Sequence, residues 1–130
     1  MKSQLLSGGV ALAGFFYTFV GVALLAVPVW FFENIGRFPP FNRHYMGDLG
    51  SFTLPIGIAL LVAAREPLKH RLLIAVVVAA NLLHAANHLY DAPGEPLAHW
   101  LVDTVPLVLF AGLFLWLFLI PVPEREQVKR

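Results

Sequence analysis

The chain has 130 residues, of which 58% are hydrophobic and only 13% are charged. A soluble domain carries about 25% charged residues, so this composition excludes an ordinary soluble globule. The net charge of +1 excludes a surface that grips nucleic acid by its phosphates. The absence of cysteine excludes disulfides and thiol chemistry.

Four apolar runs follow one another along the chain, at about 5–27, 46–64, 72–90 and 97–120. A helix that crosses a bilayer needs about 20 apolar residues, so each run is long enough to span it. The runs predict an all-α fold: a polytopic integral membrane four-helix bundle, forming a single domain over residues 1–130. We expect it in the cell membrane, in contact with lipid and without nucleic acid.

Between the first two runs, residues 28–45 mix aromatic side chains with prolines and charges. Trp30 and Phe41 lie in the same stretch as Glu33 and Arg43. Such mixtures are typical of segments that lie in the headgroup layer of a membrane. The sequence therefore predicts an interfacial aromatic segment between the first two spans.

Basic residues divide unevenly between the two ends of the predicted spans. If the N-terminus is cytoplasmic, only Arg37 and Arg43 fall on the outer side. The other seven of the nine basic residues fall inside; they are Lys2, Arg65, Lys69, Arg71, Arg125, Lys129 and Arg130. Because cytoplasmic loops are enriched in lysine and arginine, this division predicts an N-in, C-in topology.

Under this topology, polar side chains gather at the outer ends of the second, third and fourth spans. Four of the five histidines lie there. Residues four apart share one face of a helix. Three pairs have this spacing: His44 and Asp48, His84 and His88, and His99 and Asp103. A further stripe, expected to face the bundle interior, consists of Asn81, His84, His88 and Asp91.

A divalent metal site is the first interpretation of this constellation. Imidazole and carboxylate ligands suit zinc, iron or manganese, and two histidines one turn apart can bind one ion from one helix face. His84 and His88 are the preferred ligands, and either Asp48 or Asp103 supplies a carboxylate. A fourth ligand or a general base would come from His44 or His99. Whether such an ion serves catalysis is left open.

Two further interpretations fit the same residues. Haem b needs axial histidines on opposite sides of the iron, so His84 and His88 cannot both serve, and His44 or His99 would complete the pair. The chain has no CxxCH motif, so the haem would be bound non-covalently. The third interpretation is a hydrogen-bonded polar network that fixes the register of the helices or conducts protons.

The sequence FNRHYMGDLG at residues 41–50, the four short spans and the histidine-rich end of the third span resemble the small four-helix membrane proteins grouped as DoxX-like. The resemblance covers the layout of the spans across most of the chain. Some members of this group are similar to subunits of quinone-linked oxidoreductases, so the resemblance implies a redox-associated role. The alternative to a metal-binding protein is a non-enzymatic accessory subunit, or a redox-associated subunit that binds haem or quinone, of a larger membrane complex. Whether the chain's partners are copies of itself in a homo-oligomer or the subunits of such a complex is left open.

Overall fold

The computed structural model describes residues 2–37, 39–91, 93–94 and 96–121, and within them all side chains except those at positions 2, 3, 99 and 103. This described part contains helices and no strand. Four helical stretches are long and apolar enough to cross a membrane: Gln4–Ala26, Arg43–Ala63, Arg71–Asp91 and Trp100–Leu119, the last of which joins two consecutive helical segments. The chain divides into two compact units, one of residues 7–66 and one of residues 1–6 with 67–130.

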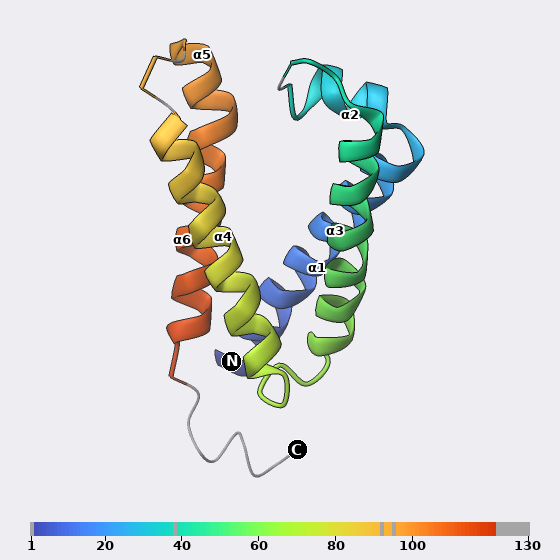
Figure 1. Cartoon of the computed structure of the whole chain (residues 1–130). Coiled ribbons are helices and arrows are strands. Elements are labelled where there is room, and N and C mark those ends of the chain that lie inside the picture. Colours follow the sequence, from blue (N-terminus) through green and yellow to red (C-terminus); the bar gives the residue numbers. More distant parts are fainter. Residues whose placement is uncertain (1, 38, 92, 95, 122–130) are drawn as a thin grey trace. The chain divides into compact units, whose positions relative to one another are not determined.

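In the first unit, the part of α1 (Lys2–Ala26) from residue 7 onward and α3 (Arg43–Ala63) run antiparallel and side by side (Figure 1). Glycines of α1 allow a close approach. A methyl group at Gly14 would lie 2.8 Å from the backbone nitrogen of Leu61, and one at Gly21 would lie 2.6 Å from the Cα atom of Leu54. Both distances are below van der Waals contact, so only glycine fits.

Glycines of α3 in turn allow a close approach of residues of α1. A methyl group at Gly57 would lie 2.4 Å from the backbone nitrogen of Thr18, and one at Gly50 would lie 2.8 Å from Cγ of Leu25. The two glycines of each helix are seven residues apart, which is two helical turns. Each helix therefore presents small residues along one line to the backbone or side chains of the other.

The short helix α2 (Pro28–Asn34) connects these two spans. Pro28 occupies its first turn, where a missing backbone N–H costs nothing. Phe31 is buried in a cluster with Ala23, Leu24 and Met46, which fixes α2 against both neighbouring helices.

The second unit pairs α4 (Arg71–Asp91) with α6 (Val105–Leu119), which pack side by side (Figure 1). The connection contains the single turn α5 (Leu97–His99) and the π-helix η1 (Trp100–Thr104), which also packs against α4. The buried residues of α4 lie along one face; they are Ile74, Val77, Val78, Asn81 and Ala85. The buried residues of α6 are Ala111, Phe114 and Leu117.

The prediction of four helices of spanning length is confirmed, with two differences. The second span begins at Arg43 rather than near residue 46, because the side-chain oxygen of Asn42 accepts a hydrogen bond from the backbone nitrogen of Tyr45 at 3.1 Å and caps the helix. The fourth is not one regular helix over 97–120. Its α-helical hydrogen bonding is interrupted by η1 just before Pro106, whose nitrogen cannot donate to the preceding turn.

Candidate functional site

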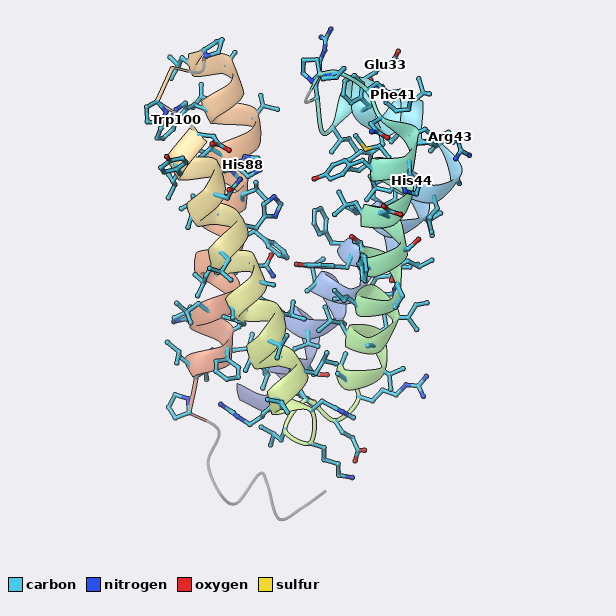
Figure 2. The ribbon with its side chains drawn as sticks, in the orientation of Figure 1. Glu33, Phe41, Arg43, His44, His88 and Trp100 are labelled. Atoms are coloured by element: carbon cyan, nitrogen blue, oxygen red, sulfur yellow. The ribbon has the colours of Figure 1, made fainter. Side chains whose placement is uncertain are left out.

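The two histidines near the end of α4 face one another. The Nε2 atoms of His84 and His88 lie 3.1 Å apart, and the ring centroids are separated by 4.8 Å. The predicted pairing of these residues across one helical turn is therefore confirmed. Figure 2 shows His88 and Trp100 at the end of the α4–α6 pair where α5 lies.

The other members of the predicted stripe take different partners. Asn81 donates from Nδ2 to the backbone oxygen of Val77 at 2.8 Å, so its side-chain amide is hydrogen-bonded within α4. Asp91 accepts a hydrogen bond from Nδ2 of Asn87 at 3.2 Å. This Asn87–Asp91 pair was missed in the sequence analysis, although it has the same four-residue spacing as the histidine pair.

Burial differs along the stripe. Asn81 is buried, as expected for a stripe that faces inward, and His88 is half-buried. His84 and Asp91 are exposed, so the prediction that the whole stripe faces the interior is wrong for these two residues. His88 is seven residues beyond Asn81 and continues the buried face of α4, whereas His84 lies on the flank of that face.

The first unit contains the pair His44 and Asp48 at the start of α3, and the prediction that these two residues share one helix face is also confirmed. His44 Nε2 lies 3.5 Å from Asp48 Oδ2, and the two side chains are 89% and 60% exposed. A pair this exposed contributes little to stability.

The third predicted pair lies on the connection between α4 and α6. His99 ends α5 and Asp103 lies in η1, so the two belong to different helical segments rather than to one regular α-helix. Their side chains lie outside the described residues. The backbone shows that η1, which contains Asp103, packs against α4, the helix of the histidine pair.

Among the described side chains, no three or more histidine, aspartate or glutamate residues come together as a group that could hold a metal ion. Of the predicted ligands, His84 with His88 and His44 with Asp48 are observed as pairs within their own units. A search of protein-family models, curated proteins and solved structures found no match to the chain. The DoxX-like resemblance remains a prediction.

Proposed function

We propose that this chain is an integral membrane protein that binds a divalent transition-metal ion through His84 and His88. The 3.1 Å distance between their Nε2 atoms supports this proposal. Imidazole nitrogens bind zinc at about 2.0–2.1 Å. Two such bonds to atoms 3.1 Å apart would enclose an angle of about 100° at the ion, between octahedral and tetrahedral values.

The proposed site draws its ligands from one unit. Asp103 is the carboxylate we favour, because it lies in η1 and η1 packs against α4. His99 precedes η1 and is the candidate for a fourth ligand, with water in any remaining position. His44 and Asp48 already pair with each other in the first unit, and the proposal does not require them.

Metal-dependent stability of the purified protein tests this function. Zinc, manganese or iron(II) should raise the melting temperature in detergent, because an ion that binds only the folded state stabilises it by about 2.7 kcal/mol at 100 times its dissociation constant. His84→Ala and His88→Ala should each abolish most of the rise. His70→Ala, a histidine in the α3–α4 loop, is the matched control and should preserve it.

Two outcomes would contradict the proposal. One is that no metal copurifies and no ion changes the melting temperature of the unaltered protein at neutral pH, where the imidazoles can coordinate. The other is a rise that survives both substitutions on α4, since the ion would then be bound elsewhere. The first outcome, combined with destabilisation of the metal-free protein by the substitutions, would identify the contact between His84 and His88 as a structural hydrogen bond.

A further inference from the structure

The helix α2 has one face fixed by packing. Phe31 is only 7% exposed and contacts Ala23 and Leu24 of α1 and Met46 of α3 through the cluster described above. The first two of these residues are in the last turn of α1, and Met46 is in the first turn of α3. Phe31 therefore holds α2 at the level where both spans end.

The segment beyond Phe31 is also fixed in place. Backbone nitrogens of Ile35 and Gly36 both donate to the Phe31 oxygen, at 2.8 and 3.1 Å. The rings of Phe32 and Phe41 meet edge to face at 5.3 Å between centroids. The exposed side chains of this segment are therefore attached to a backbone that packing and hydrogen bonds hold in place.

The other face of α2 carries exposed apolar and aromatic side chains. Val29 is 52% and Trp30 is 46% exposed. Arg37 and Arg43 are exposed cations of the same segment, against the single exposed anion Glu33. Figure 2 shows Glu33, Phe41 and Arg43 around this end of the α1–α3 pair.

We propose that this face, with Trp30 as its anchor, binds the headgroup layer of a phospholipid bilayer. Packing places it where two apolar spans end, and that level in a membrane is the interface. Tryptophan favours this layer because its ring is apolar and its N–H can remain hydrated. The two arginines complement lipid phosphates, to which guanidinium groups donate charge-assisted hydrogen bonds.

Depth-dependent fluorescence quenching tests the proposal. Trp30 is made the only tryptophan by Trp100→Phe and Trp116→Phe, and the protein is reconstituted into phosphatidylcholine vesicles. Bromine atoms on the acyl chains are placed either near the headgroup or near the bilayer centre. The ratio of shallow to deep quenching should exceed one for Trp30.

The control is Phe52→Trp in a background without other tryptophans. Phe52 is a 74% exposed residue of mid-α3, and the ratio should fall below one there.

A second label avoids altering the tryptophans. The chain has no cysteine, so a nitroxide on Val29→Cys reports its depth by power saturation with oxygen and a water-soluble nickel complex. An interfacial depth supports the proposal. Trp30 quenched by neither bromine position together with a nitroxide at Val29→Cys that is fully accessible to nickel would overturn it, because the face would then lie in water. Absence of quenching with a nitroxide shielded from both reagents would also overturn it, because a protein surface would then cover the face.

Discussion

The Nε2 atoms of His84 and His88 lie 3.1 Å apart, a distance at which the two nitrogens share either a proton or a bound cation. A neutral imidazole has one N–H and one nitrogen with a lone pair. If His84 and His88 share a hydrogen bond, one Nε2 carries the proton and the other accepts it, so the rings are opposite tautomers. If they share a cation, both Nε2 atoms present lone pairs and each ring carries its proton on Nδ1, so only the donor ring changes tautomer. The same geometry therefore serves two chemistries, and the added ion decides between them.

A second side chain of α4 acts on the end of α6. The Arg71 guanidinium lies 4.7 Å from the centroid of the Phe118 ring, and its Nη2 atom lies 3.5 Å from the Phe118 backbone oxygen. The last carbonyls of a helix have no partner within it and carry partial negative charge. Arg71 thus supplies both a donor and a positive charge to the last turn of α6.

We predict that Arg71→Gln lowers the free energy of unfolding by about 1 kcal/mol, because it removes the cation from the ring and the helix end. Arg71→Lys should lower it less, since the charge remains. Arg65→Gln, at an exposed loop position, is the control. Unfolding by sodium dodecyl sulfate in mixed micelles, followed by circular dichroism, measures the three variants. Equal effects of Arg71→Gln and Arg65→Gln would show that the contact with Phe118 contributes nothing.

Residue spacing was sufficient to predict contacts within one helix and insufficient beyond it. The pairs His84–His88 and His44–Asp48 follow from the four-residue repeat of the α-helix, which needs no tertiary information. Asp91 pairs with Asn87 because both lie in the last turns of α4 and have the same spacing. Ligands contributed by other helices depend on packing between helices, which the period of one helix does not contain.

At the scale of elements, the α1–α3 pair is held by reciprocal glycines. Small residues let two backbones approach, and in lipid this packing replaces a hydrophobic driving force between helices. Thr18 illustrates how close the approach is. A methyl group at Gly57 would lie 2.6 Å from its side-chain oxygen, and that oxygen is buried without a hydrogen-bond partner among the described residues.

We predict that Gly57→Ala destabilises the protein by about 1–3 kcal/mol, because the methyl group would force α1 away from α3. Gly47→Ala in the same helix has no neighbouring atom within 4 Å. It should be neutral or stabilise by up to about 1 kcal/mol, since alanine favours the helix. Unfolding in mixed micelles compares the two variants. Similar free energies for both would contradict the close packing of α1 on α3.

The helices themselves were predictable from hydropathy, but their ends and packing were not. A window of apolar residues does not register that Asn42 caps α3 or that Pro106 follows a π-helix, because both effects depend on single backbone groups. The glycine lines were missed for a similar reason. Gly14 and Gly21 are seven residues apart, and this spacing indicates a helix contact only when Gly50 and Gly57 of the facing helix are known to lie beside it.

At the scale of the whole molecule, the distribution of charge predicts orientation. The connection between α4 and α5 carries no lysine or arginine, whereas the stretch from Arg65 to Arg71 carries three. Positive residues close to span ends are retained on the cytoplasmic side during insertion. The end of α4 that carries His84 and His88 should therefore lie in the outer leaflet.

We predict from this asymmetry that both termini are cytoplasmic, and cysteine labelling in intact cells measures it. The chain has no cysteine of its own, so each substitution creates one reporter. A membrane-impermeant maleimide should label Gly94→Cys from outside, and it should label Gln127→Cys only after the membrane is opened. Reversed labelling would place the histidine pair on the cytoplasmic side, where any bound metal would come from the cell interior. Labelling of both positions from outside would mean that an even number of spans, rather than the single predicted span at 97–120, lies between them, and the four-span topology would fail.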